Sequence, residues 1–242
     1  MKNQILTVKD NKRISDDVFV MKFEKEENEY KAGQFVELKV DGFTLRRPFG
    51  VYDFEKGELS LLYKVVGQGT AKMATMKRGE KIDALTELGN GFNVDKAKKP
   101  LLIGGGLGAA PLYYLAKTFK ENGIKAEMLL GARTQSDLVF LNDFKNVADV
   151  KVATDDGTSG FKGNVVEALK HYDFDCDFYY ACGSLAMLKR VASYSTNGEI
   201  SMEARMACGF GACMGCSIMT TDGAKRVCKD GPVFYAKEII FE

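Results

Sequence analysis

Four cysteines near the C-terminus constrain this chain more than any other feature. Cys208 is followed by Cys213 after four intervening residues, by Cys216 after two more, and by Cys228 after a further eleven. Four thiolates at such spacing can converge on one centre, and C-x4-C-x2-C with a later cysteine is typical of plant-type [2Fe–2S] clusters. Residues 202–230 are rich in glycine and cysteine and have little hydrophobic periodicity, so we expect a bound cluster to order this segment.

A structural zinc site made of four cysteines is the alternative. Zinc sites more often combine two C-x2-C pairs, and this segment holds only one. Gly209, Gly211 and Gly215 lie between the ligands, where glycine lets backbone N–H groups turn toward cluster sulfurs without a side-chain clash. The spacing therefore favours an iron–sulfur cluster over zinc, and zinc over free structural cysteines.

The overall charge and the apolar runs exclude other classes of protein. The chain has 34 Lys and Arg against 33 Asp and Glu, a net charge of +1, which gives no basic field for nucleic acid. Its longest apolar stretch, Leu101–Ala116, contains four glycines and a proline and falls short of the roughly 20 residues of a membrane span. A single histidine, His171, excludes a histidine-based triad combined with a metal site. We expect a cytoplasmic protein, whose reduced cysteines serve metal or redox chemistry.

Two different patterns of elements precede the cysteines. Residues 1–95 hold short runs rich in β-branched residues, which predict an antiparallel β-barrel with one helical stretch at Gly69–Met76. From residue 96 strands and helices alternate, which predicts a parallel sheet covered by helices. We therefore expect three domains, 1–95, 96–200 and 201–242. The expected strands are Gln4–Lys9, Val18–Glu24, Gln34–Val40, Leu59–Val65, Pro100–Ile103, Lys125–Gly131, Val150–Thr154 and Phe178–Ala181, and the later helices are Ala109–Asn122, Asn164–His171 and Leu185–Ser193.

A glycine-rich turn in the second part predicts a nucleotide site. It follows a predicted strand, opens a helix and contains Gly104, Gly105, Gly106 and Gly108. Glycines let the backbone approach a pyrophosphate and the helix N-terminus stabilises its charge, although such turns also serve packing alone. The acid that usually holds a ribose hydroxyl is absent, because the next strand ends at Arg133. Arg133 faces either a 2′-phosphate or solvent, so the choice between NAD and NADP stays open.

The barrel carries a third motif. Arg47 precedes a proline, and Gly69 and Thr70 begin the helical stretch. An arginine beside a fixed proline can neutralise a phosphate or a reduced flavin, and a glycine at a helix start favours anions. Tyr63 offers an aromatic face to a ring system. A solvated arginine and a plain helix cap are the other interpretations.

Together these motifs resemble the electron-transfer subunits of class 1B dihydroorotate dehydrogenases. The resemblance covers essentially the whole chain, and its most specific part is the run from Ser201 to Cys213 that continues at Cys228–Phe234. It implies a flavin-binding barrel of the ferredoxin-reductase type, an α/β domain that binds NAD, and a C-terminal [2Fe–2S] domain. The implied cluster ligands are Cys208, Cys213, Cys216 and Cys228.

The resemblance also implies the flavin and nicotinamide sites. Family members commonly carry serine at the position of Gly50, where its hydroxyl bonds the flavin, so a backbone N–H would substitute here. Cys182 would approach the nicotinamide, with a small buried hydrophobe as the equal alternative. The residues implied to bind FAD are Arg47, Pro48, Phe49, Gly50, Leu62, Tyr63, Lys64, Gly69 and Thr70.

The implied function is an electron relay. FAD would exchange a hydride with NAD and single electrons with the cluster. The cluster would connect FAD with the FMN of a catalytic subunit that oxidises dihydroorotate in de novo pyrimidine (UMP) biosynthesis, in a heterotetramer of two copies of each subunit. The cluster loop would be the docking face. The alternatives are a related subunit for another redox partner, in which aspartate tends to replace one cysteine, a flavin reductase without a partner, and a zinc-binding adaptor without enzymatic activity.

Overall fold

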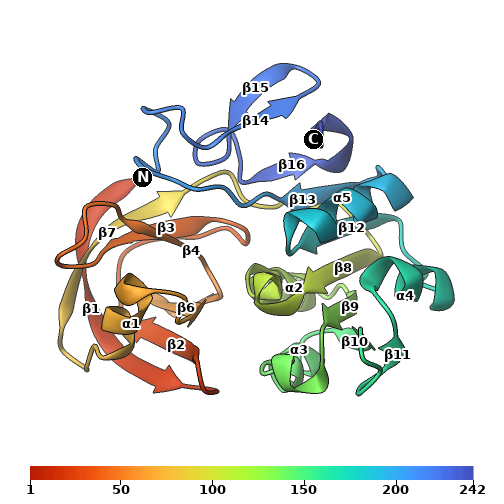
Figure 1. The fold of residues 1–242 in the computed structure, drawn as a ribbon, viewed down its shortest axis with the longest axis horizontal. Coiled ribbons are helices and arrows are strands. Elements are labelled where there is room, and N and C mark those ends of the chain that lie inside the picture. Colours follow the sequence, from red (N-terminus) through yellow and green to blue (C-terminus); the bar gives the residue numbers. More distant parts are fainter. Residues whose placement is uncertain (242) are drawn as a thin grey trace.

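The computed structural model describes residues 1–241 and contains, within that range, two seven-stranded sheets and one hairpin (Figure 1). The first sheet is antiparallel and curls into the predicted barrel, in the order β4-β3-β7-β1-β2-β6-β5. Helix α1 (Gln68–Ala74) lies in the sequence between the strands β6 and β7 of this sheet. No helix in the described range has the length and apolar character needed to cross a membrane. The strands are β1 (Lys2–Arg13), β2 (Val18–Phe23), β3 (Phe35–Lys39), β4 (Arg47–Gly50), β5 (Asp53–Glu55), β6 (Glu58–Lys64) and β7 (Lys81–Leu88).

The side chains of β3 point alternately to the inside and the outside of the barrel, and both sets are buried over the first four residues of the strand. Val36 and Leu38 pack with Leu59 in the barrel interior. Phe35 belongs instead to a cluster that includes the C-terminal segment. Successive side chains of a strand point to opposite faces, so Glu37 shares the outer face with Phe35. This face of the barrel is therefore an internal interface and not a solvated surface.

The second sheet has the order β11-β10-β9-β8-β12-β13-β16 and is parallel except for β16. Helices α2 and α3 lie on the side of the barrel, and α4 and α5 cover the other face (Figure 1). The strands are β8 (Pro100–Gly105), β9 (Glu127–Ala132), β10 (Asp149–Thr154), β11 (Phe161–Lys162), β12 (Phe178–Cys182), β13 (Gly198–Ser201) and β16 (Val233–Tyr235). The helices are α2 (Pro111–Glu121), α3 (Leu141–Lys145), α4 (Val165–His171) and α5 (Leu185–Tyr194).

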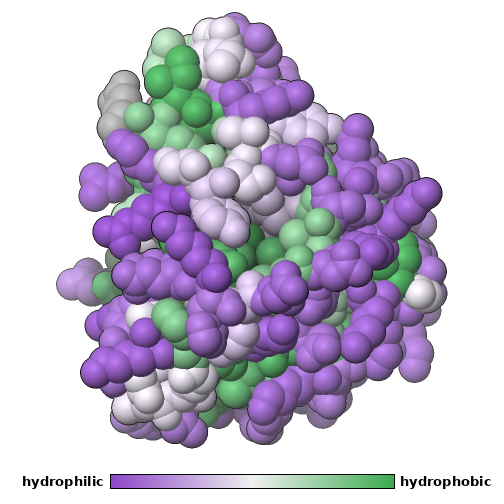
Figure 2. Space-filling model, turned by 90° about the vertical axis from the view of Figure 1, so that its right-hand side faces the viewer, coloured by the Kyte–Doolittle hydropathy of each residue, from purple (hydrophilic) through white to green (hydrophobic). Residues whose placement is uncertain are grey.

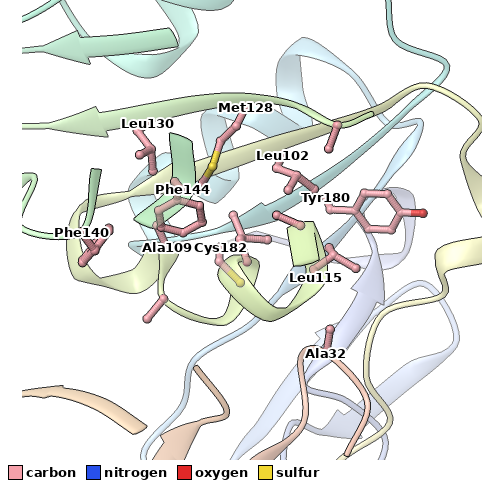
Figure 3. Packing of buried hydrophobic residues seen from close by; sticks show 14 of the residues in the cluster. Ala32, Leu102, Ala109, Leu115, Met128, Leu130, Phe140, Phe144, Tyr180 and Cys182 are labelled. Carbon is pink, nitrogen blue, oxygen red and sulfur yellow. The ribbon is translucent and has the colours of Figure 1, made fainter. Parts of the chain in front are cut away.

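Both faces of this sheet are apolar, as a parallel sheet between two layers of helices requires. Leu102, Leu130 and Tyr180 pack with Leu115 of α2 and Phe144 of α3 (Figure 3). Neighbouring residues of the same strands pack with α4 and α5 in a second cluster. The sheet is thus held on both sides, and its carboxyl edge remains for ligands.

The C-terminal segment is interlaced with the second sheet. β16 pairs antiparallel with β13, with Ser201 opposite Val233, so the cysteine-containing loop leaves the sheet and returns to it. A hairpin of β14 (Ser217–Thr220) and β15 (Gly223–Arg226) projects from this loop at the top of Figure 1. The division into three domains stays a prediction, and β16 extends the sheet of the predicted middle domain.

Candidate functional site

The four predicted cluster ligands lie on one loop as two pairs. The side chain of Cys213 acts on Cys208 and lowers its pKa, and the side chain of Cys216 acts on Cys228 and raises its pKa. The backbone N–H of Cys228 also donates to Cys216 Sγ at 3.4 Å. Within residues 1–241 no three His, Cys, Asp or Glu side chains are grouped so as to hold a single metal ion. Two pairs of thiols fit a [2Fe–2S] cluster, whose irons each take two thiolates, better than one tetrahedral zinc ion.

Backbone N–H groups converge on the sulfur of Cys208. Ala212 donates to it at 3.3 Å, and Gly209 and Gly211 hold φ angles of 73° and 91°, which glycine adopts without strain. Burial raises the pKa of Cys208, but hydrogen bonds from the loop, that of the Phe210 N–H first, outweigh it and lower this pKa to about 6. The loop therefore stabilises the thiolate, which is the form that binds iron.

Glu37 on β3 lies against this loop. Its side chain is 0% exposed, and neither carboxylate oxygen has a hydrogen-bond partner in the described chain. A Cβ on Gly209 would lie 2.2 Å from Glu37 Oε2, so the loop can pass here only as glycine. Burial raises the pKa of Glu37 to about 7, while the charge of Arg46 lowers it and Cys208 raises it. The sequence gives no local sign of this position, because a charged residue in a strand normally faces solvent.

Arg47 at the start of β4 is held against helix α1. A Cβ on Gly69 would lie 2.9 Å from Arg47 Nε, and the guanidinium lies 5.0 Å from the centre of the Phe43 ring. In the described part of the chain its hydrogen-bond partners are the backbone carbonyls of Leu45 and Arg46. Among residues 1–241 no carboxylate forms an ion pair with Arg47, so its charge is available to an anionic group such as the phosphates of FAD.

Other residues predicted to bind FAD have structural partners. Tyr63 is 2% exposed; its hydroxyl donates to Asn11 Oδ1 at 3.0 Å, and its ring packs on Phe49. Thr70 is buried, and its Oγ1 accepts the backbone N–H groups that precede α1. Tyr63 and Thr70 thus hold the barrel around α1, whereas Pro48 is exposed.

Gly50, where the family resemblance implies a serine, lies at a close contact between β4 of the barrel and the start of α2. A Cβ at this position would lie 2.8 Å from Pro111 Cγ at the start of α2. A serine would therefore require β4 and α2 to move slightly apart. Of the remaining predicted residues, Leu62 is buried in the core shared with α2, and Lys64 pairs with Asp17 at 2.8 Å.

Packing requires two of the four glycines in the glycine-rich turn, Gly104 and Gly108, whereas Gly105 faces the flexible side chain of Met187. A Cβ on Gly104, Gly105 or Gly108 would lie 2.5, 2.5 and 2.9 Å, respectively, from the nearest protein atom. Gly106 differs, because its φ is +53° and no atom lies within 4 Å of the Cβ position. Gly106 is therefore the position where the backbone is free to approach a ligand.

A cavity of about 860 Å³ opens at the carboxyl edge of the second sheet. The chain order reverses between β8 and β12, which is where open parallel sheets bind their ligands. The ends of β8, β9 and β10, the starts of α4 and α5, and the barrel loop 15–18 line the cavity. Gly105 and Gly106 belong to the lining, and Gly104 and Gly108 do not. A bound nucleotide would thus lie between the barrel and the sheet.

Cys182 ends β12 and is 2% exposed. It lies outside the cavity lining, and Figure 3 shows it within the apolar cluster near Ala109. Burial raises its pKa to about 12, although hydrogen bonding with Ser201 lowers it. These surroundings favour packing over contact with a nicotinamide.

Relatives of known identity match both parts of this site. Residues 203–240 match the family model "Iron-sulfur cluster binding domain of dihydroorotate dehydrogenase B", and residues 102–193 match "Oxidoreductase NAD-binding domain". The chain is 39% identical over 261 residues to the "Dihydroorotate dehydrogenase B (NAD(+)), electron transfer subunit" of Fusobacterium nucleatum, with 100% of both chains covered. It is 38% identical over 250 residues to the subunit of the same name from Caldanaerobacter subterraneus, covering 100% of this chain and 98% of the relative.

Solved structures show the same fold. A structure of an NADH-dependent reduced ferredoxin-NADP oxidoreductase superposes with a TM-score of 0.87 at 29% identity, covering 98% of this chain and 90% of the other. A ferredoxin NADP+ reductase from Neisseria gonorrhoeae gives a TM-score of 0.68 at 18% identity, covering 80% and 90%. The predicted fold class, a barrel followed by a parallel sheet and a C-terminal iron–sulfur segment, is confirmed.

Proposed function

This chain belongs to the family of electron transfer subunits of dihydroorotate dehydrogenase B (NAD(+)), and we propose that it relays electrons between NAD and a catalytic partner subunit in pyrimidine biosynthesis. It is an oxidoreductase component that uses FAD, a [2Fe–2S] cluster and NAD. When bound, FAD supplies hydride exchange with the nicotinamide and single-electron exchange with the cluster. FAD is needed because an iron–sulfur cluster cannot accept a hydride.

One observation carries this proposal. Cys216 and Cys228 share a hydrophobic cluster with Phe35 of β3 and Leu88 of β7, so the cysteine loop packs directly on the barrel. The cavity at the carboxyl edge of the sheet reaches the barrel through loop 15–18. The barrel thus touches both the loop that would hold the cluster and the cavity that would hold the nucleotide. This arrangement suits a relay in which the group on the barrel is the middle member.

We assign the following roles to the chain's own residues. The four cysteines bind the cluster as two pairs, and the loop N–H groups stabilise the Cys208 thiolate. Arg47 neutralises an anionic part of FAD, and Gly106 lets a pyrophosphate approach the backbone. Lys64 holds loop 15–18 at the cavity through Asp17. The residues proposed to surround FAD are those predicted from the sequence: Arg47, Pro48, Phe49, Gly50, Leu62, Tyr63, Lys64, Gly69 and Thr70.

The catalytic partner would dock on the C-terminal segment. Phe210, Met214, Met219 and Ile240 are large hydrophobic side chains there, each between 45% and 51% exposed. Figure 2 shows hydrophobic surface gathered at the top of the molecule, where this segment lies. Exposed apolar side chains of this kind mark interaction sites. We propose that the partner carries FMN, that two copies of each subunit assemble, and that the complex is cytoplasmic.

An anaerobic absorption spectrum of the purified protein, with flavin and iron quantitation, tests the proposal. We expect one flavin, about two irons and about two acid-labile sulfides per chain, and bleaching when NADH is added. Reduction of the partner subunit's flavin by NADH, only when this chain is present, is the second expected result. Zinc without colour, or a coloured protein that NADH leaves oxidised, would overturn the proposal. Efficient transfer to a ferredoxin but not to the partner would favour a related reductase instead.

A further inference from the structure

The end of β9 carries an ion pair that the sequence motif does not reveal. Arg133 follows β9 directly, and its Nε lies 3.1 Å from Asp137 Oδ2, one turn further along the chain. Both residues line the cavity together with Gly106. The sequence shows no acid at the strand end, but the structure brings one there from a short 3₁₀ helix (Gln135–Asp137).

The place of this pair in the sheet is where a bound dinucleotide has its ribose. β9 runs parallel to β8, with Gly131 opposite Gly105. The strand beside the glycine-rich turn therefore ends next to that turn, and in sheets of this type an acid there binds the ribose 2′-hydroxyl. A 2′-phosphate in the same position needs a free arginine instead. At the end of β9 the Nε of Arg133 is already paired with a carboxylate, although its side chain is 79% exposed.

The other charged residues of the cavity lining also disfavour a 2′-phosphate. The cavity lining holds four aspartates and three basic residues: Asp16, Asp17, Asp137 and Asp155 against Lys64, Arg133 and Arg190. Lys64 and Arg133 are each paired with one of the aspartates. Asp155 follows β10, and its backbone N–H donates to Ala132 O at 3.1 Å, which places this further carboxylate beside the end of β9. An added phosphate dianion would meet acceptors and negative charge at this edge.

The loop after β10 fixes the position of the loop that carries Asp137. Gln135 N–H donates to Thr158 Oγ1 at 2.9 Å, and the hydroxyls of Thr134 and Thr158 lie 3.2 Å apart. Thr158 Oγ1 in turn donates to Asp156 Oδ1 at 2.7 Å. The loop after β10 therefore holds the loop after β9, and a preorganised contact discriminates between ligands better than a mobile one.

We propose that Asp137 is the specificity-determining residue that makes this chain select NAD over NADP. Its carboxylate neutralises Arg133 and accepts the ribose 2′-hydroxyl, and it repels a 2′-phosphate. This inference rests on the proposed function, because it concerns the nucleotide site of that same relay.

The variant Asp137→Asn in the cofactor-loaded protein is the test. Removal of the carboxylate frees Arg133, so we expect the ratio of kcat/KM for NADPH to that for NADH, measured as flavin reduction, to rise roughly 10-fold or more. Calorimetric binding of 2′,5′-ADP should tighten by a similar factor, whereas binding of ADP-ribose should weaken. Adding Arg133→Ala to Asp137→Asn should abolish the gain in both measurements.

The control removes the same charge from an ion pair outside the cavity. Asp149 pairs with Lys125 at 3.2 Å at the other end of β10, and Asp149→Asn should leave the ratio unchanged. If Asp137→Asn folds poorly, Asp137→Ser serves in its place. A ratio within twofold of the parent in the folded Asp137 variant, or a gain that survives Arg133→Ala, would overturn the inference. Failure of both nucleotides to reduce the parent protein would instead overturn the proposed function.

Discussion

The carboxylate of Glu37 has an unusual setting for a single residue. It lies between the barrel and the cysteine loop, fully buried and without a hydrogen-bond partner among residues 1–241. Burying an unpaired charge is costly, and such a group retains its proton to a higher pH. For Glu37 burial raises the pKa from 4.5 to about 7. The residue therefore couples the stability of the folded chain to pH.

Glu37→Gln should remove this pH dependence. The folded state binds the proton more tightly than the unfolded state, so the stabilisation by the protonated form is complete below pH 4.5 and is lost as pH rises toward 7. The full loss corresponds to about 3 kcal/mol. We expect the free energy of unfolding of Glu37→Gln, relative to the parent, to increase between pH 5 and pH 8 in urea titrations of the same preparation. Glu24→Gln, at an exposed position just after β2, is the matched control, and a difference that stays constant with pH would contradict the prediction.

At the scale of elements, strands and helices with a clear apolar pattern can be predicted from the sequence, and elements that form by tertiary pairing cannot. Val18–Glu24 is rich in β-branched and aromatic residues and forms β2, and Leu185–Ser193 has helical periodicity and forms α5. β7 (Lys81–Leu88) mixes charged residues with alanine and leucine, so it lacks a strand pattern and forms between β1 and β3 by tertiary pairing. β16 has three residues and exists only because β13 pairs with it.

Asn90 joins β16 to the connection that follows β7. Its Nδ2 donates to Val233 O at 2.7 Å, and its Oδ1 accepts Val233 N–H at 3.1 Å. Asn90→Ala leaves both backbone groups without these partners, so we expect a loss of about 1–3 kcal/mol in the free energy of unfolding. Thermal unfolding should also begin earlier in the segment that holds the cysteines, which hydrogen exchange of its amides can report. Asn142→Ala, at an exposed position on α3, should cost much less, and equal losses in the two variants would refute this role.

At the scale of the whole molecule, the candidate site divides into parts that are local in sequence and parts that are not. The cysteine ligands and the glycine-rich turn can be predicted, because their residues are neighbours along the chain. Glu37 and Asp137 cannot, since their surroundings are built by other elements. Tyr63 illustrates the same limit: the sequence predicts an aromatic face for a ring system, and only the fold shows that this ring packs in the barrel core.

Docking of the catalytic partner involves the whole molecule. We expect Phe210→Asp and Met214→Asp each to weaken the complex at least 10-fold, because a buried apolar contact would become a desolvated charge. Analytical ultracentrifugation or calorimetry with the partner measures this loss, while flavin and iron contents should stay at the parent level. Tyr194→Asp on α5 replaces another half-exposed ring and should bind normally. Unchanged affinity in both loop variants would place the docking face elsewhere.

The pairing of Ser201 with Val233 also has a consequence for maintenance of the protein. The cysteine-bearing excursion begins and ends at neighbouring positions of one sheet, so the sheet can remain intact while the excursion opens. Local opening of this kind requires less free energy than global unfolding. Replacement of a damaged cluster would then require only this local opening, with the rest of the protein folded.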